Sequence, residues 1–271
     1  MQGTEPKTKE QQVDMTAEMI RIRRGNLTGR ALKSAVESGF DPAALLTLPD
    51  APAKCCKRGR TVQAAADGTF FVKRFCHRNL WKSVCHIFKA RRPEICLRGA
   101  AHIAAGGIAT PQVFAALRKY RWGLPQFDYL ITQDISSSAV FADKMPLSAE
   151  LAEKLVILLA DLHRLGVEHG DVSLRNLYCT VSGSWGVIDL DNCRIFSGSL
   201  PPARRIRELA RLASSFLKLT EGVVPDGMEK DIPGFFARIY CRCSGFDPEC
   251  SAYRKRVAYL AERKRKQHVQ S

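Results

Sequence analysis

The chain has 271 residues, of which 45% are hydrophobic, 25% charged and 8% aromatic. This composition is globular and excludes an intrinsically disordered or collagen-like chain. Lys and Arg number 42 against 27 Asp and Glu, and the net charge of +15 favours anionic partners such as nucleic acid, phosphorylated substrates or the acidic inner leaflet of a membrane. The longest apolar run, Leu155 to Ala160, is far shorter than the roughly 20 residues that cross a bilayer, and the polar N-terminus lacks the apolar core of a signal peptide. We therefore expect a cytoplasmic protein that does not span a membrane.

The sequence contains ten cysteines. In a chain of this length without an export signal, we expect reduced thiols, most of them small core residues. Cys55-Cys56, and Cys241-x-Cys243 with Cys250 nearby, raise the alternative of a metal-thiolate site. Adjacent cysteines and C-x-C fit structural zinc spacing poorly, and no His cluster completes either set.

The front half of the chain is predicted to begin with a tail and to continue as a hairpin. Residues 1–26 are polar, end in an arginine-rich stretch, and are interpreted as a flexible tail running into a short helix. Residues 27–271 are expected to form one domain. Two β-rich runs between Thr61 and Phe75 are separated by Asp67-Gly68, a common hairpin turn, so the second strand leads into Lys73.

Basic helices are predicted next, then apolar strands and a boundary. Apolar spacing predicts a helix from Leu80 and a second helix from Pro93 to Gly106-Gly107. Apolar residues at 111–117 and 129–131 follow. The stretch from Ser136 to Pro146 resembles a linker, so we expect residues 55–132 and 136–271 to form separate lobes.

The back half is predicted to be mainly helical. Ser148 is expected to cap a helix whose leucines form one apolar stripe and which ends at Gly166. Short strands are expected around 177–179 and 186–188, and a further helix is expected around Ile206 to Phe216.

The loop between that capped helix and the first short strand carries the residues most suited to phosphoryl transfer. It reads H-G-D-V-S-L-R-N from His169 to Asn176 and is followed by V-I-D-L-D from Val187 to Asp191. Phosphoryl transfer needs an oriented hydroxyl and metal-held phosphates. Asp171 is a candidate general base, and Asn176 and Asp189 offer hard oxygen ligands for Mg²⁺. Asp191 lies two residues from Asp189, on the same side of an extended segment, and is a further candidate metal ligand.

These motifs resemble the protein-kinase-like superfamily and, more narrowly, the bacterial lipopolysaccharide core kinase family, whose members phosphorylate Kdo or heptose hydroxyls. The resemblance covers about Arg58 to Leu219. It also includes F-F-V-K-R-F, G-I-A-T-P-Q-V, D-Y-L-I-T-Q-D-I, L-H-R-L-G-V-E-H-G-D, I-D-L-D-N-C-R and R-E-L-A-R-L-A-S-S-F. It implies an α+β, two-lobed protein-kinase-like fold with a small N-terminal antiparallel sheet lobe and a mainly helical C-terminal lobe.

The resemblance also implies roles for individual residues. Lys73 would bind the α- and β-phosphates of ATP, Asp171 would be the base, and Asn176 and Asp189 would hold Mg²⁺. The segment from Thr132 to Ile135 would be the hinge between the lobes. Its backbone groups, those of Gln133 and Ile135 in particular, would bind adenine.

The sequence departs from the protein-kinase pattern at three places. The expected phosphate loop, Lys57 to Thr61, has a single glycine, Gly59, and Arg58 and Arg60 are the candidates that would hold phosphate by charge instead. Ser173 stands where a lysine is usual, although Arg175 on the same loop could neutralise the γ-phosphate. Asp191 replaces the glycine of D-F-G.

Glu94 has two interpretations. It is the one acid between Asp67 and Asp128, so elimination makes it the candidate ion-pair partner of Lys73. It also follows Pro93 in a first helical turn, where an acid often only complements the helix dipole.

Together these features predict an ATP-dependent kinase that phosphorylates a sugar hydroxyl of the lipopolysaccharide inner core. The alternatives are a small-molecule kinase of the aminoglycoside or choline type, an atypical protein kinase, or a non-catalytic basic scaffold. Nucleic acid is not expected as a partner, because no supporting motif is present. The basic residues at 254–256 and 263–266, and those around Trp81 and Phe88, are interpreted either as solvated faces or as a peripheral contact with the anionic membrane.

Overall fold

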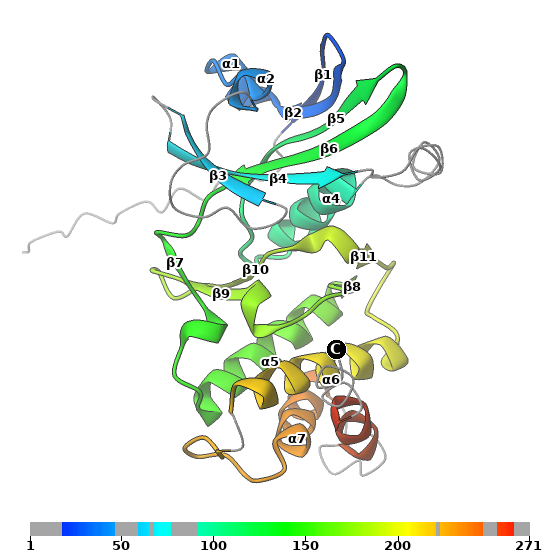
Figure 1. The fold of residues 1–271 in the computed structure, drawn as a ribbon. Coiled ribbons are helices and arrows are strands. Elements are labelled where there is room, and N and C mark those ends of the chain that lie inside the picture. The colour runs from blue at the N-terminus through cyan, green and yellow to red at the C-terminus, as the bar shows by residue number, and fades with distance from the viewer. Residues whose placement is uncertain are drawn as a thin grey trace, which may run out of the picture.

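The computed structural model of the chain describes residues 18–46, 59–64, 68–76, 92–220, 223–245 and 254–262. It is a mixed α+β structure in which an antiparallel sheet comes first along the chain and helices predominate after it. Figure 1 shows the sheet at one end of the molecule and the later helices at the other. The order of elements therefore agrees with the predicted sheet followed by a helical part.

Six strands form the sheet within the described residues. They are β1 (Met19–Arg24), β2 (Leu27–Leu32), β3 (Gly59–Ala64), β4 (Gly68–Cys76), β5 (Val113–Arg121) and β6 (Leu124–Gln133). Their order is β1-β2-β5-β6-β4-β3, and every neighbouring pair is antiparallel. The predicted hairpin is confirmed, because Gln63 on β3 pairs with Thr69 on β4. Lys73 lies on β4 and pairs with Leu130 on β6.

The first strand corrects the expected tail. Met19–Arg24 is an edge strand rather than the end of a flexible tail or a short helix, so the sheet begins well before residue 55. The alternation of Ile20 and Ile22 with exposed arginines has a period of two, which suits a strand with one face packed. Residues 1–17 lie outside the described part of the chain.

The two faces of the sheet are covered by different elements. One face carries Phe70, Val72, Leu117 and Ile131, and it packs near the short helices α1 (Lys33–Glu37) and α2 (Pro42–Leu45). The other face packs on α4 (Arg92–Ala105), whose Cys96, Ala100 and Ile103 join the core of the helical part. Helix α4 fits the predicted helix from Pro93 to Gly106. The helix expected from Leu80, with its basic residues, falls in residues 77–91, which lie outside the described part of the chain.

The segment expected to be a linker has structure of its own. Residues Ala139–Phe141 form β7, which pairs with β9 (Leu177–Thr180), and a 3₁₀ turn follows at Ala142–Lys144. Strand β9 also pairs with β10 (Trp185–Val187), as the predicted strands require. The polar composition at 136–146 concealed a strand because β7 has only three residues and is not fully buried. A third small sheet pairs β8 (Val167–Glu168) with β11 (Arg194–Ile195).

The later helices enclose the largest core. Helix α5 (Ala149–Arg164) begins as predicted, because the Ser148 hydroxyl accepts a hydrogen bond from the Leu151 N–H at 3.1 Å. Helices α6 (Pro202–Leu219) and α7 (Ile232–Ser244) pack beside it, and residues 254–262 form a further helix. The buried faces of these helices meet at Leu155, Leu162, Phe216, Phe236 and Val257. This core supports the loops that follow α5.

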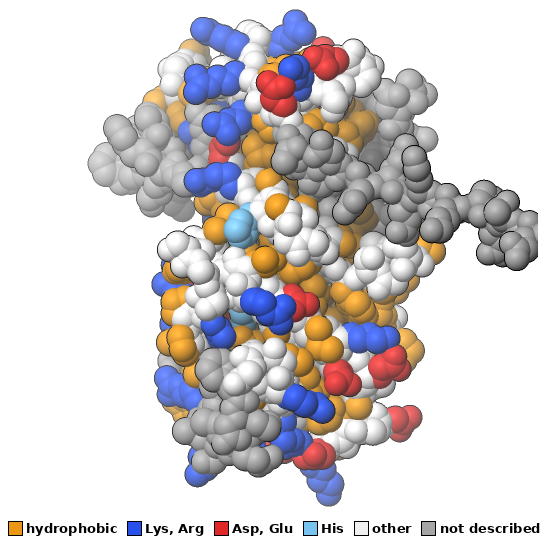
Figure 2. All heavy atoms as spheres, turned by 180° about the vertical axis from the view of Figure 1, so that it is seen from behind, with side chains coloured by type: hydrophobic (Ala, Val, Ile, Leu, Met, Phe, Trp, Pro, Cys, Tyr) orange, Lys and Arg blue, Asp and Glu red, His pale blue; other side chains and the backbone are white. Residues whose placement is uncertain are grey.

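The charged surface is mixed where it is visible. On the face drawn in Figure 2, Lys and Arg side chains form a column along one side of the sheet region, with a few Asp and Glu beside them. Over the helices the two kinds of charge are interspersed. Arg254, Lys255 and Arg256 lie in the helix at 254–262, and residues 263–266 fall outside the described part. Among the described residues, no helix has both the length and the apolar character needed to cross a membrane.

Candidate phosphotransfer site

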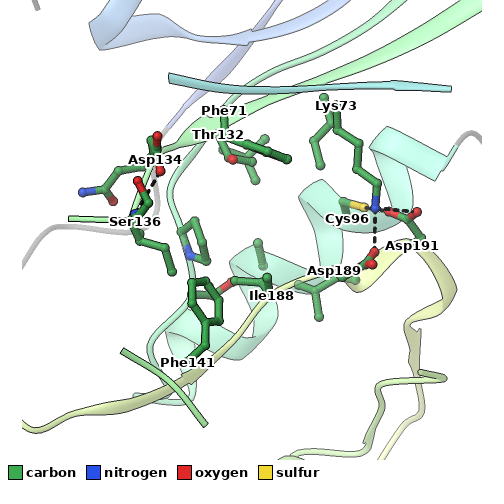
Figure 3. Close-up of a pocket in the computed structure, with 18 residues that line it drawn as sticks. Phe71, Lys73, Cys96, Thr132, Asp134, Ser136, Phe141, Ile188, Asp189 and Asp191 are labelled. Atoms are coloured by element: carbon green, nitrogen blue, oxygen red, sulfur yellow. Dashed lines mark hydrogen bonds and ion pairs between the residues drawn. The ribbon is translucent and has the colours of Figure 1, made fainter. Parts of the chain in front are cut away.

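A cavity of about 610 Å³ lies between the sheet and the segment that follows β10. Its apolar wall includes Phe71 from β4, Leu130 from β6, and Phe141 and Ile188 from the opposite side (Figure 3). Lys73, Asp189 and Asp191 form its charged end. The cavity is thus apolar at one end and strongly charged at the other.

The predicted hinge residues lie along the wall of this cavity. Thr132, Gln133, Asp134 and Ile135 all line it, at the end of β6 and just beyond. The carboxylate of Asp134 accepts a hydrogen bond from the Ser136 N–H at 2.9 Å, which fixes the chain as it leaves the sheet. Backbone groups of this stretch are therefore held next to the apolar part of the cavity.

Lys73 joins the two aspartates at the charged end. Its Nζ lies 2.6 Å from Asp189 Oδ1 and 2.8 Å from Asp191 Oδ2, and its side chain is only 13% exposed (Figure 3). Burial works against the charge on Lys73, but the two carboxylates outweigh it and raise its pKa. Burial also opposes the charge on both acids. Lys73 nevertheless lowers the pKa of Asp189, whereas burial together with the charge of Asp189 raises the pKa of Asp191.

Asp189 adopts an uncommon backbone conformation. Its φ of 62° and ψ of 55° lie in the left-handed region, which costs free energy for a residue other than glycine. The 3₁₀ turn at Leu190–Asn192 follows at once. This sharp change of direction brings the carboxylates of Asp189 and Asp191 to the same ammonium group.

Glu94 does not reach Lys73. Its carboxylate lies 3.9 Å from Arg30 Nε on β2, and Lys73 takes Asp191 as its second partner. Cys96, two residues further along α4, faces the cluster and donates a hydrogen bond from Sγ to Asp191 Oδ1 at 3.3 Å. Residues two apart on a helix point in nearly opposite directions, so Glu94 and Cys96 cannot both face the cavity. Burial, and then the neighbouring Asp191, raise the pKa of the Cys96 thiol, which keeps it protonated as a donor.

The loop after β8 holds Asp171 and Asn176 in place through the main chain. The Asn176 amide donates from Nδ2 to the Asp171 carbonyl at 2.8 Å, which leaves its side-chain oxygen as the acceptor end. The Ile188 N–H donates to the Asn176 carbonyl at 2.9 Å, so Asn176 is held beside the segment that carries Asp189. Asp171 is exposed and lines a second cavity together with Arg175.

His169 ties this loop to the Asp189 segment. The Asp171 N–H donates to Nδ1 at 3.3 Å, and Nε2 lies 2.9 Å from the Ile188 carbonyl. With Nδ1 accepting, Nε2 carries the proton and donates to Ile188. The ring is fully buried, so its hydrogen bonds set the spacing between the two segments.

Glu208 was not among the sequence-predicted site residues, although it lies within the R-E-L-A-R-L motif. Its carboxylate accepts hydrogen bonds from the His169 and Gly170 N–H groups, both at 2.8 Å. It is fully buried on α6, and although burial favours its neutral form, hydrogen bonding and the nearby histidines lower its pKa. The available signal was an acid within the apolar-spaced helix around 206–216, because a buried acid must find partners. Arg211, three residues along the helix and 3.6 Å away, is one partner, and the main-chain N–H groups of the loop after β8 are the others.

Gly170 allows the loop to pass close to its neighbour. Its φ of 84° is in the left-handed region, and a Cβ atom there would lie 2.5 Å from the Asn192 carbonyl oxygen. The loop that carries Asp171 and the turn after Asp189 are therefore in direct main-chain contact.

Neither Arg58 nor Arg175, both expected to contact phosphate, is among the described residues that line the first cavity. Arg58 lies outside the described residues. Arg175 is 81% exposed, its Nε lies 3.8 Å from Asp143, and it lines the second cavity rather than the first.

The donor set at the charged end suits Mg²⁺. Among the described residues, no group of three or more His, Cys, Asp or Glu side chains is arranged to hold a metal. Magnesium typically uses one or two carboxylates together with substrate phosphates and water, rather than a cage built entirely of protein. Two carboxylates against one lysine leave a net negative charge, and Asn176 adds an amide oxygen nearby. Asp189, Asp191 and Asn176 are therefore the residues that would hold the ion.

The predicted thiol chemistry is described only in part. Cys96 and Cys193 are buried free thiols, Cys179 and Cys243 are free and partly buried, and Cys241 is buried. Cys55, Cys56 and Cys250 lie outside the described residues.

Comparisons with known proteins relate this chain to sugar kinases. A model of the lipopolysaccharide kinase (Kdo/WaaP) family matches residues 102–236, which include Asp171, Asn176, Asp189 and Asp191. Two curated relatives, each named 3-deoxy-D-manno-octulosonic acid kinase, come from Vibrio vulnificus strains CMCP6 and YJ016. They are 30% and 29% identical over 115 residues, which make up 41% of this chain and 47% of each relative. The chain thus matches about half the length of these relatives.

The family implies a kinase-like fold and the use of ATP, which agrees with a sheet followed by helices and with the cavity between the sheet and the Asp189 segment. By this match, the chain belongs to the lipopolysaccharide kinase (Kdo/WaaP) family.

Proposed function

We propose that this protein transfers the γ-phosphate of ATP to a sugar hydroxyl, from Kdo or heptose, in the inner core of lipopolysaccharide. One observation carries the proposal. Lys73, Asp189 and Asp191 converge within 2.8 Å at the charged end of a 610 Å³ cavity whose other end is apolar. Such a site suits a nucleotide, because the flat faces of its aromatic base can pack against apolar side chains while its phosphates lie at the charged end. The fold is then the two-lobed protein-kinase-like arrangement, with the lobes joined near residues 132–136.

The first cavity would hold the nucleotide. The base lies between Phe71 and the opposite wall formed by Phe141 and Ile188, next to the backbone of Gln133 and Ile135. Lys73 extends from β4 to the phosphates. Asp189, with Asn176 and Asp191, would hold Mg²⁺, and the bound ion would supply neutralisation of the phosphate charge.

Asp171 would act on the acceptor. It lies on the neighbouring loop, exposed to the second cavity, and its carboxylate accepts the proton of the attacking hydroxyl. Glu208 and His169 position this loop through the hydrogen bonds to its main chain.

The choice of acceptor rests on the relatives. Both curated proteins are named as kinases of 3-deoxy-D-manno-octulosonic acid, a sugar acid, and the matched family is a lipopolysaccharide kinase family. Since such an acceptor is anchored in a membrane, we place the reaction at the cytoplasmic face. There the net charge of +15 favours peripheral contact with anionic lipid.

The test is a transfer assay with the full chain, labelled ATP and Mg²⁺. The acceptor panel contains lipid-linked Kdo, heptose-containing core, an aminoglycoside and a generic protein substrate. We expect label on one of the two core acceptors, and the label should disappear in Asp171→Asn. Label on the aminoglycoside or on protein alone would replace the proposed acceptor, and ATP binding without transfer to any acceptor would contradict the proposed reaction.

A further inference from the structure

We propose that the second cavity is a binding site for the anionic group of the acceptor, with Arg175 and Lys218 as its ligands. The cavity has a volume of about 390 Å³ and is lined by the loop after Asp171 and by the last turns of α6. This inference rests on the proposed function, because it assigns the acceptor side of the same reaction.

The position of the cavity favours an acceptor rather than a nucleotide. Asp171 lines it, whereas Lys73, Asp189 and Asp191 line the other cavity. A hydroxyl that meets the Asp171 carboxylate must therefore belong to a molecule lying in the second cavity. A volume of 390 Å³ is within the usual range for sites that take a small molecule.

The cations around this cavity are not equally free to bind a ligand. Arg211 donates from Nη1 to the Gly170 carbonyl at 2.5 Å and lies 3.6 Å from Glu208. Its guanidinium therefore stabilises the loop that carries Asp171 and is already engaged by protein groups. Arg175 is mostly exposed, and its nearest acid, Asp143, is 3.8 Å away, a distance too long for a hydrogen bond. Lys218 is exposed and forms no ion pair with the other described residues.

Lys218 and Arg175 act on one another. Partial burial lowers the pKa of Lys218, and the positive charge of Arg175 lowers it further. Two like charges held at one cavity repel each other, and an anion bound between them relieves that repulsion. The cavity therefore presents two cations beside the candidate base. Asp143 also lines the cavity, but at 3.8 Å from Arg175 it makes no hydrogen bond that would occupy the guanidinium.

A sugar acid fits this arrangement chemically. Its carboxylate can accept charge-assisted hydrogen bonds from a guanidinium and an ammonium group while one of its hydroxyls reaches Asp171. A phosphate on the same acceptor offers the same chemistry. Neutral sugars offer neither, so the two cations would select an acidic acceptor.

The experiment measures both binding and turnover with the full chain. The probes are the methyl glycoside of 3-deoxy-D-manno-octulosonic acid, the same glycoside with its carboxylate methylated, and a phosphorylated lipid-linked acceptor with and without that ester. The variants are Arg175→Gln and Lys218→Gln. The matched control is Lys154→Gln, which removes an exposed charge from α5 that lines neither cavity.

We expect each variant to raise the KM for the acid glycoside about tenfold or more, the scale of a lost charge-assisted hydrogen bond, with the KM for ATP unchanged. The methyl ester should bind the wild-type protein as weakly as the acid binds the variants. If the lipid-linked ester is still used and both variants still weaken it, the anion at this site is the phosphate. Unchanged KM values in both variants, or equal use of acid and ester glycosides with no effect of the variants, would overturn the proposal.

A binding measurement separates failure of the anion site from failure of the proposed phosphotransfer reaction. If the wild-type chain transfers no phosphate, ligand-observed NMR with the acid glycoside decides the question. Binding that is lost in both variants and kept in Lys154→Gln supports the anion site without the reaction, and no binding to the wild-type chain overturns it.

Discussion

Two groups of buried charges lie on the sheet, and they are built differently. Arg118 on β5 and Asp128 on β6 are cross-strand neighbours joined by two hydrogen bonds of 2.6 and 2.9 Å, and their side chains are 2% and 3% exposed. Lys73 on β4 faces two aspartates instead of one, and Asp189 keeps 35% of its side chain exposed at the cavity. The first pair is balanced and closed, whereas the second group has one negative charge in surplus and is open on one side.

The difference separates charges that hold the fold from charges that receive a ligand. A buried pair with matched charges has no capacity left for a further ion, and its loss leaves an uncompensated charge in the core. A group with surplus negative charge at a cavity attracts a cation, and the opposite shifts of the Asp189 and Asp191 pKa values follow from that surplus.

The largest expected effect separates the two aspartates of the proposed reaction. Asp171→Asn should lower turnover by about 10² to 10⁴ while ATP binding is kept, because the base meets only the acceptor. Asp189→Asn should remove Mg²⁺-dependent ATP binding, yet change the free energy of unfolding by less than about 1 kcal/mol, since Lys73 keeps Asp191. Calorimetric titration with ATP and single-turnover rates measure both. Equal loss of ATP affinity in the two variants would contradict these roles.

The matched pair should respond in the opposite way. Asp128→Asn leaves the Arg118 charge buried without its counter-charge and should cost about 3 to 5 kcal/mol of stability, measured by urea unfolding. Folded protein at low temperature should still bind Mg²⁺-ATP. A loss of stability no larger than that of Asp189→Asn would remove the distinction between the two groups.

A smaller effect tests which acid serves Lys73. Asp191→Asn should lower kcat/KM for ATP about tenfold or more, a loss of at least about 1.4 kcal/mol in transition-state stabilisation, because Lys73 loses one of its two anchors and Mg²⁺ one of its proposed ligands. Glu94→Gln should stay within about twofold of wild type, since Glu94 lies nearest to Arg30. The reverse order of effects would restore Glu94 as the partner.

The smallest expected effect is the pH dependence of stability that comes from His163, a buried histidine that the fold keeps neutral. Burial lowers the pKa of His163 on α5, against the influence of Glu208, so the folded state keeps it neutral below its ordinary value. Between about pH 6.5 and 5 the unfolded chain binds a proton that the folded chain does not, and stability should fall by up to about 1.4 kcal/mol per pH unit. His163→Gln should flatten this slope in urea unfolding at pH 7 and 5.5.

The sequence predicts those elements whose causes are local. The cap at Ser148, the leucine stripe of α5 and the two β-rich runs on either side of the Asp67-Gly68 signal each act over a few residues. The expected cap, helix and paired strands β3 and β4 are present. Strand β7 was missed because it has only three residues, none of them buried, and so carries little periodicity. Strand β1 was missed because its arginines outweighed the alternation of Ile20 and Ile22.

The sequence identifies the charged residues at the end of the first cavity, but it does not identify which acids contact Lys73. Lys73, Asp189 and Asp191 were each singled out, and the fold brings them together. Their pairing depends on which face of α4 points at the cavity, and elimination along the sequence cannot determine a helix rotation. Cys96 facing Asp191 and Glu208 bonded to the His169 and Gly170 N–H groups are consequences of tertiary packing across 95, 39 and 38 residues.

The contact at Gly170 also limits how this protein can vary. A side chain at residue 170 would meet the main-chain oxygen of Asn192, which is present whatever residue stands at 192. A clash with a side chain can be relieved by a second substitution at the opposing position, but this one cannot. We therefore expect a selection for suppressors of Gly170→Ala to yield reversion to glycine, or changes that move a whole segment, and no compensating substitution at position 192.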